Sequence, residues 1–97
     1  MALIKIGRKK VVVNGERVNL SDAVNVLGIP KYKDFILHVW GKPVYVTYVL
    51  RDVFLKKGNA LKWSIDTVKA SGCLYRVVKY KKGKRTLYAL YKKCPAR

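Results

Sequence analysis

The chain of 97 residues is about half apolar, and its 22 Lys and Arg against 5 Asp and Glu give a formal net charge of +17. This length allows one domain with a single core. No apolar stretch reaches the roughly 20 residues that span a bilayer, and no leader segment is visible, so we expect an intracellular protein, cytoplasmic or nucleoid-associated. The charge excess far exceeds what solubility requires and favours nucleic acid as the partner. We do not expect the protein to bind a membrane.

The first part of the chain, residues 1–30, predicts a small N-terminal β-hairpin and a short helix. Asn14-Gly15 is typical of a type I′ hairpin turn between apolar runs. Ser21 is the expected N-cap of the helix, and Gly28 ends it. We expect this segment to belong to the same domain as residues 31–97.

Two helices are expected next, at Lys31–Trp40 and Tyr48–Lys57. Each contains apolar residues at positions i, i+1, i+4 and i+5, and each is followed by a glycine. Val44–Val46 between them predicts a brief extended segment. A third helix, Ala60–Ser71, follows Asn59 as its expected N-cap, with a buried stripe through Leu61 and Val68.

The polar side of this third helix is the first candidate for function. An ion pair of Asp66 with Lys62 or Lys69 would contribute only tenths of a kcal/mol, which is a weak structural reason for these residues. Trp63 and Thr67 lie beside them. We expect Trp63 to cap the core near the following hairpin, and base contact is the alternative.

The last thirty-one residues, Thr67–Arg97, predict a positively charged hairpin. Two runs rich in β-branched and aromatic residues, Cys73–Tyr80 and Arg85–Tyr91, flank an expected turn at Lys82-Gly83, which would place Tyr80 opposite Arg85. Like charges crowded at the tip repel one another, and a phosphate backbone would relieve that repulsion. The alternative is a solubilising loop tip. The crowded residues are Lys79, Lys81, Lys82, Lys84 and Arg85.

This order of elements resembles the archaeal and bacterial winged helix-turn-helix DNA-binding domains over about two thirds of the chain, Lys33–Lys92. The motifs that carry the resemblance are Val46-Thr47, Ser64-Ile65-Asp66-Thr67-Val68-Lys69, Ser71-Gly72-Cys73-Leu74 and Lys82-Gly83-Lys84-Arg85-Thr86-Leu87-Tyr88-Ala89-Leu90. The resemblance implies an α+β fold in which helix 60–71 enters the major groove and wing 73–92 grips phosphates, the two forming one continuous surface. The implied DNA-binding residues are Lys62, Trp63, Asp66, Thr67, Lys69, Lys79, Lys81, Lys82, Lys84 and Arg85.

Residues 19–30 also resemble the first half of an excisionase-like helix-turn-helix. In that alternative the segment Lys31–Trp40 would carry recognition. Its only basic residues are Lys31 and Lys33, so the charge distribution favours the C-terminal assignment.

The sequence predicts neither catalysis nor a metal site. The acids are scattered singly, His38 lies in an apolar segment, and Cys73 and Cys94 lack zinc-site spacing. We expect two free thiols, with a disulfide between them as the alternative. The tyrosines Tyr75, Tyr80, Tyr88 and Tyr91 should fall on both faces of the hairpin, packing on the core with their hydroxyls in water. Stacking on single-stranded bases is the alternative.

The expected function is therefore sequence-specific binding of double-stranded DNA by a small transcriptional regulator, without cofactor or small-molecule ligand. A homodimer in contact through the N-terminal sheet is possible on geometric grounds if the DNA site is palindromic. The alternatives are a non-specific architectural or chromatin-like protein and an RNA-binding or virion structural component.

Overall fold

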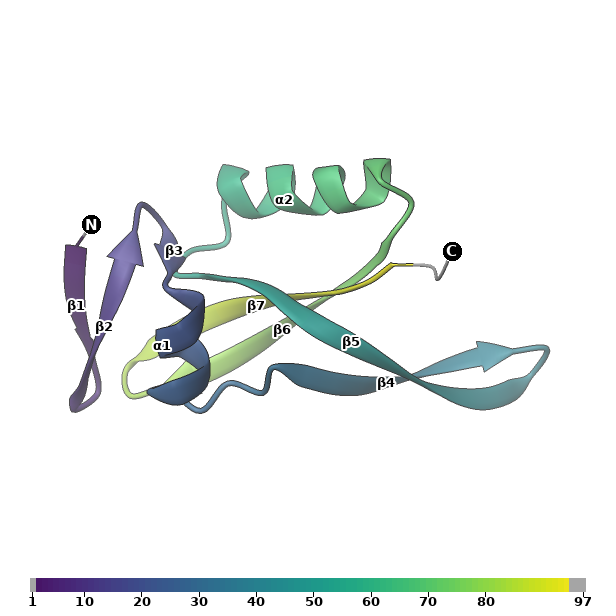
Figure 1. Ribbon diagram of the computed structural model, residues 1–97, viewed down its shortest axis with the longest axis horizontal. Coiled ribbons are helices and arrows are strands. Elements are labelled where there is room, and N and C mark those ends of the chain that lie inside the picture. Colours follow the sequence, from purple (N-terminus) through teal and green to yellow (C-terminus); the bar gives the residue numbers. More distant parts are fainter. Residues whose placement is uncertain (1, 95–97) are drawn as a thin grey trace.

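The computed structural model describes residues 2–94, without the side chains of Asn59 and Ala60, so Pro95–Arg97 of the predicted segment 31–97 lie outside the described residues. Seven strands and two helices occupy this range, and the strands form an antiparallel sheet in the order β1-β2-β3-β5-β7-β6, with β4 paired to β5 (Figure 1). The elements are β1 (Ala2–Ile6), β2 (Lys9–Asn14), β3 (Arg17–Val18), α1 (Leu20–Asn25), β4 (Tyr32–Val39), β5 (Lys42–Phe54), α2 (Asn59–Ala70), β6 (Leu74–Lys82) and β7 (Arg85–Lys93).

The predicted winged helix-turn-helix is wrong, because β4 and β5 occupy the segments expected to be helices 31–40 and 48–57. Along β4, the half-buried Lys33, Phe35 and Leu37 alternate with exposed residues, which is the period of a strand. The apolar residues of this segment also fit a helical spacing, so the spacing alone did not distinguish the two structures. The alternative recognition helix at 31–40 is excluded with it.

The N-terminal hairpin, the short helix and the helix near residues 60–71 are confirmed, with a shifted turn and shifted caps. Asn14 pairs with Arg17, so the turn residues are Gly15 and Glu16, and the predicted turn at Asn14-Gly15 is wrong by one residue. The side chain of Asn19, not Ser21, caps α1 by accepting a hydrogen bond from the backbone of Asp22. Gly58, not Asn59, occupies the N-cap position of α2. These shifts of one or two residues do not change which face either helix buries.

The C-terminal hairpin is confirmed, but its register is shifted by two residues from the predicted one. Lys82 pairs with Arg85 and Tyr80 with Leu87, so the two turn residues are Gly83 and Lys84. Gly83 has a φ of +62°. Glycine at the first turn position is the pattern of a type II′ turn, whereas the prediction had placed it second.

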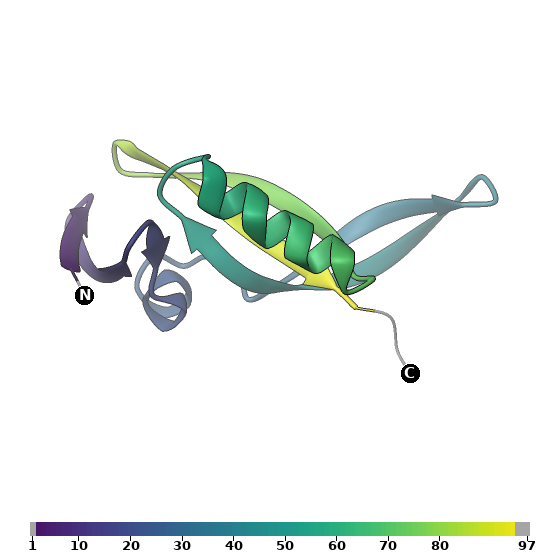
Figure 2. The same ribbon diagram turned by 90° about the horizontal axis from the view of Figure 1, so that it is seen from above.

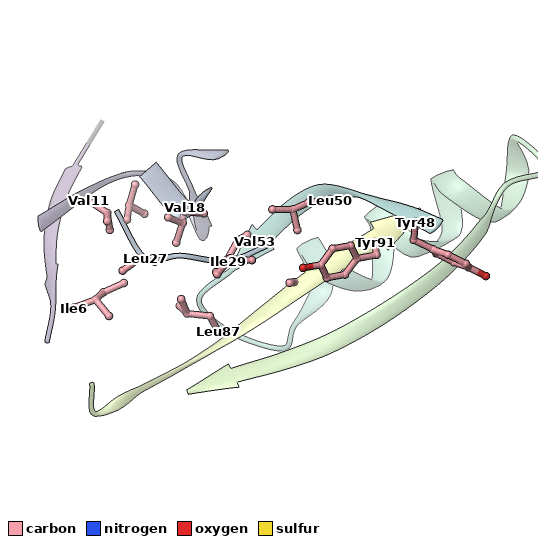
Figure 3. Packing of buried hydrophobic residues seen from close by; sticks show 13 residues of the cluster. Ile6, Val11, Val18, Leu27, Ile29, Tyr48, Leu50, Val53, Leu87 and Tyr91 are labelled. Carbon is pink, nitrogen blue, oxygen red and sulfur yellow. The ribbon is translucent and has the colours of Figure 1, made fainter. Parts of the chain in front are cut away.

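Apolar side chains pack on both faces of the sheet. The larger cluster includes Val11, Ile29, Val53, Leu87 and Tyr91 and joins β1, β2 and α1 to the long strands (Figure 3). On the other face α2 covers Phe54 and Leu90 with its buried residues Leu61 and Val68. In Figure 1, α2 lies along one face of the sheet, and the β1–β2 hairpin and α1 lie toward one end of the molecule.

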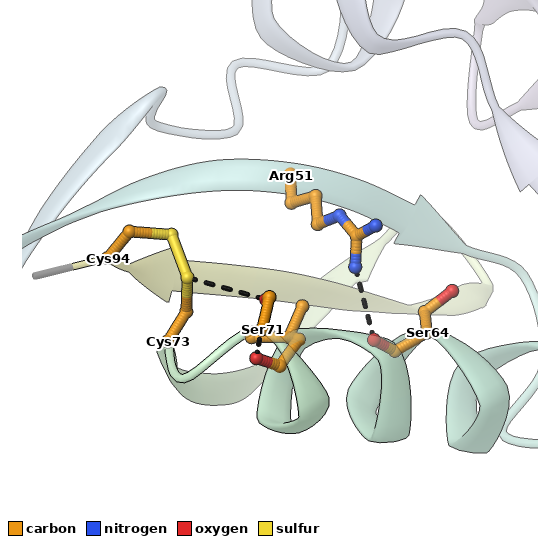
Figure 4. Close-up of a disulfide and its surroundings, with 6 residues drawn as sticks. Arg51, Ser64, Ser71, Cys73 and Cys94 are labelled. Atoms are coloured by element: carbon orange, nitrogen blue, oxygen red, sulfur yellow. Dashed lines mark hydrogen bonds between the residues drawn. A yellow bond between two sulfur atoms is a disulfide. The ribbon is translucent and has the colours of Figure 1, made fainter.

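Two arginines and a disulfide hold α2 in place. Arg17 donates a hydrogen bond to the buried Ser64 hydroxyl, and Arg51 donates to the Ser64 carbonyl oxygen (Figure 4). A disulfide between Cys73 and Cys94 closes the base of the β6–β7 hairpin, so the expectation of two free thiols is wrong. The corrected register explains the bond, because residues 73 and 94 lie one step beyond the Leu74–Lys93 pair.

The β4–β5 hairpin extends well beyond the rest of the molecule (Figure 2). It makes the molecule elongated, with extents of 45 × 24 × 22 Å. Within residues 2–94, neither helix has the length and apolar character that crossing a bilayer requires.

Candidate nucleic-acid interface

The tip of the β6–β7 hairpin rests on the turn of the β1–β2 hairpin. Both turns have two residues, Gly7-Arg8 and Gly83-Lys84, and they lie side by side in both overall views (Figures 1 and 2). A Cβ atom on Gly83 would lie 2.8 Å from the backbone nitrogen of Gly7 and 2.9 Å from its Cα atom. Only glycine permits this approach, so the positively charged tip has a defined position against the body of the protein.

A broad, open cleft of about 970 Å³ lies where these two turns meet the loop that joins β5 to α2. We call it the turn cleft. No Asp or Glu lines it. Its basic lining residues are Lys5, Lys56, Lys57, Lys84 and Arg85.

Three of the five acidic residues of the chain are engaged elsewhere. Asp22 accepts a hydrogen bond from the backbone of Val12, and Asp34 accepts one from Thr47. Asp52 lies 4.0 Å from Arg17, the single ion pair within the described part of the chain. The positive potential of the turn cleft is therefore unopposed by any carboxylate in its lining.

The lysines predicted for the wing occupy two faces of the hairpin. Lys79 Nζ lies 5.9 Å from the ring centroid of Tyr88, on the face that α2 covers. Lys82 Nζ lies 5.8 Å from the ring centroid of Tyr80, on the opposite face, and Lys81 is exposed. A cation–π contact holds an ammonium group in place and leaves its charge free to attract an anion.

The residues predicted on the helix all lie on the outer side of α2. Lys62, Asp66 and Lys69 are exposed, and the Thr67 hydroxyl donates to the Trp63 carbonyl oxygen. Trp63 is 61% exposed, so its expected role as a cap of the core is wrong. Lys69 Nζ lies 5.4 Å from the ring centroid of Tyr75, which places this end of α2 on the same side of the sheet as Lys79.

The structure thus divides the predicted site into two parts. Lys84 and Arg85 line the turn cleft, while the α2 residues and Lys79 lie on the helix-covered side of the sheet. The sequence-based prediction missed Lys5, Lys56 and Lys57. The pair Lys56-Lys57 before Gly58 was visible as a basic run, but nothing local indicated that it meets the hairpin tip.

The hairpin tyrosines do fall on both faces, as predicted. Tyr75 and Tyr88 pack beneath α2, and Tyr80 and Tyr91 pack on the opposite face. The Tyr91 hydroxyl donates to the Pro30 carbonyl oxygen at 2.7 Å and lies 3.0 Å from the Tyr80 hydroxyl, so it is not in water as expected. Burial, and then the hydrogen bond with Tyr80, raise the pKa of Tyr91 well above its ordinary value.

No group of three or more metal-ligating side chains occurs among residues 2–94. His38 is exposed on β4. The absence of enzymatic activity and of a cofactor stays a prediction.

Comparison of the chain with protein-family models, with curated proteins and with solved structures gave no match. The function is therefore inferred from the residues of this chain alone.

Proposed function

We propose that this protein binds duplex DNA, chiefly through the phosphate backbone, with the turn cleft as its anchoring site. The observation that carries the proposal is the meeting of five basic side chains from three separate segments, with no acid among the residues that line the cleft. Most protein hydrogen bonds to DNA go to phosphate and sugar, and Lys and Arg supply many of them. A location where DNA is present, such as the cytoplasm, belongs to the same proposal.

The physical argument concerns repulsion. Lysines and arginines brought to one cleft raise the free energy of the folded state, by an amount that salt reduces. The close approach of Gly83 to Gly7 maintains this arrangement, because the tip cannot move away without breaking a backbone contact. A phosphate backbone removes the repulsion and releases counterions. If about six phosphates are neutralised, log K should fall with log[salt] at a slope of about −5.

Two features favour a duplex over a single strand. A two-stranded β-ribbon such as the β6–β7 tip fits the major groove of B-DNA, which is about 12 Å wide. The hairpin tyrosines are also poorly placed for stacking on bases. Tyr91 is buried, Tyr80 bonds to it, and lysine side chains lie over the rings of Tyr75 and Tyr88.

Binding with little sequence discrimination is the form of the proposal that the surface supports. The turn cleft offers cations suited to phosphates. Asp66 and Thr67 on α2 are candidates for reading bases, but α2 lies on a sheet and not in a helix-turn-helix. Regulation of transcription and recognition by α2 stay predictions, as does the homodimer. RNA binding remains the alternative.

The test compares two double variants that each remove two positive charges. We expect Lys84→Ala with Arg85→Ala to weaken binding to every duplex and to reduce the salt slope by about 2, since each phosphate contact contributes about 1. Lys62→Ala with Lys69→Ala serves as the matched control on α2. The measurement is fluorescence anisotropy of a labelled duplex across a salt series. Equal losses in the two variants would reject the turn cleft as the anchor.

A second measurement addresses specificity. Selection from a random duplex pool at physiological salt should enrich no sequence by the roughly 10³-fold that is typical of regulators. Such an enrichment would overturn the non-specific form of the proposal. Tighter binding to structured RNA than to duplex DNA would overturn the choice of DNA.

A further inference from the structure

The β4–β5 hairpin carries an exposed apolar tip that the turn cleft does not use. We define the arm as residues 36–45, beyond the point where β5 begins to pair with β7 at Val49. Trp40 at its tip is 96% exposed. The other large exposed apolar residues of the arm are Ile36, Val39, Val44 and Tyr45.

The conformation of Trp40 is as unusual as its exposure. The described part of the chain has four two-residue hairpin turns, Gly7-Arg8, Gly15-Glu16, Trp40-Gly41 and Gly83-Lys84. Trp40 has a φ of +54° and is the only residue other than glycine with a positive φ within residues 2–94. This conformation costs a bulky residue about 1–2 kcal/mol relative to glycine or asparagine. Burial does not recover that cost, so folding alone does not account for a tryptophan here.

We infer that the arm is a nucleobase-binding wedge whose Trp40 ring stacks on bases of the DNA that the turn cleft holds. This inference rests on the proposed function and extends it to a second contact. Apolar side chains inserted between base steps are a known way for proteins to kink a duplex, and base–aromatic stacking is independent of sequence. Lys42, paired with Val39 beside the turn, adds a positive charge two residues after Trp40.

The dimensions are compatible with one duplex at both sites. The hairpin tip at the turn cleft and the arm lie toward opposite ends of the long axis (Figure 1). The whole long axis measures 45 Å. At 3.4 Å per base pair, a duplex that contacts both ends would need about 13 base pairs.

Two other occupants fit the arm less well. Among residues 2–94, the two strands of the arm pair only with each other, so the outer edge of each strand has unpaired backbone groups. Unpaired backbone groups are costly in hydrocarbon, which disfavours insertion into a membrane. A second copy could pair along an edge, but Trp40 lies beyond the last ladder pair, Val39–Lys42, and would stay uncovered. Two chains of charge +17 also repel each other.

Tryptophan fluorescence tests the inference, because the chain has two tryptophans. Trp63→Phe leaves Trp40 as the only reporter, and Trp40→Phe leaves Trp63. We expect a 24-base-pair duplex to quench Trp40, and heparin, a polyanion without bases, to leave its emission unchanged. Quenching by a single-stranded thymidine oligomer and not by the duplex would support stacking of bases on the Trp40 ring, with unpaired bases as the ligand. Equal quenching by heparin would overturn the inference.

Binding measurements separate this inference from the proposed function. Trp40→Ala should weaken binding to the duplex about tenfold, and the matched Trp63→Ala should leave it unchanged. If the duplex binds, but neither Trp40→Ala nor Trp63→Ala changes its affinity and the Trp40 emission does not change, the inference of a wedge is wrong and the proposed anchoring site is retained. If no duplex binds, the proposed function fails. A change of Trp40 emission with protein concentration alone, or with anionic lipid vesicles and not with DNA, would assign the arm to a second copy or to a membrane instead.

Discussion

Gly83 packs against Gly7 so closely that a single added methyl group would collide with the backbone of the neighbouring turn, at 2.8 Å from its nitrogen. This contact joins the last hairpin of the chain to the first and forms one wall of the turn cleft. The position of the cleft cations therefore depends on two residues that have no side chains.

The first prediction concerns this contact. Gly83→Ala should destabilise the protein by about 3 kcal/mol, because it combines a positive φ with an overpacked contact. Gly15→Ala is the matched control, since Gly15 has a similar φ of +66° and nothing within 4 Å of its added Cβ. The control should cost about 1 kcal/mol in urea unfolding. Equal losses would mean that the two turns do not touch in solution.

A second prediction concerns the lysines that sequence reasoning missed. Lys56→Ala with Lys57→Ala should weaken duplex binding about tenfold and lower the salt slope by about 2. Lys92→Ala with Lys93→Ala removes the same charge at the opposite end of β7, outside the cleft, and should have a much smaller effect. Anisotropy titrations of the two variants decide between a local site and a general attraction to positive charge.

The disulfide supplies a third prediction. Reduction of Cys73–Cys94, which closes a loop with a sequence separation of 21, should lower the free energy of unfolding by about 3 kcal/mol. Urea unfolding with and without a reductant measures the change. The double variant Cys73→Ala with Cys94→Ala should match the reduced protein and show no response to reductant. An unchanged urea midpoint on reduction would show that the bond does not form.

Stability at alkaline pH is a fourth prediction. The folded-state pKa of Tyr91 is raised, so above the ordinary tyrosine pKa of about 10 the unfolded state loses a proton that the folded state keeps. Stability from this group is complete below pH 10 and falls as the pH rises above it. Tyr91→Phe should be less stable near neutral pH, because the hydroxyl bonds to Pro30 and Tyr80 are lost, and should decline less steeply above pH 10. The measurement is the free energy of unfolding, obtained from urea titrations of both proteins at each pH. If it falls equally in the two proteins above pH 10, Tyr91 is not the group responsible for the alkaline decline.

Local sequence patterns were sufficient to predict the type of secondary structure at both ends of the chain. The two apolar runs before Asn14, the amphipathic stripe of α2 and the alternating C-terminal runs each have one dominant periodicity. The segment 31–57 did not, because its aromatic and β-branched residues satisfy a helical spacing and a strand spacing at once. The choice of strand over helix was decided by long-range pairing across the β4–β5 hairpin, as between Phe35 and Val46.

Composition and local charge established by themselves that the chain is strongly basic, that its charge concentrates toward the C-terminus and that its last hairpin has a cationic tip. Only the tertiary structure decided which cations meet. Lys5, Lys56 and Arg85 lie far apart along the chain, and the approach of Gly83 to Gly7 brings them to one cleft. The physical reason is that charge is a property of each residue, whereas a binding site requires distances between residues, which long-range strand pairing and backbone packing set.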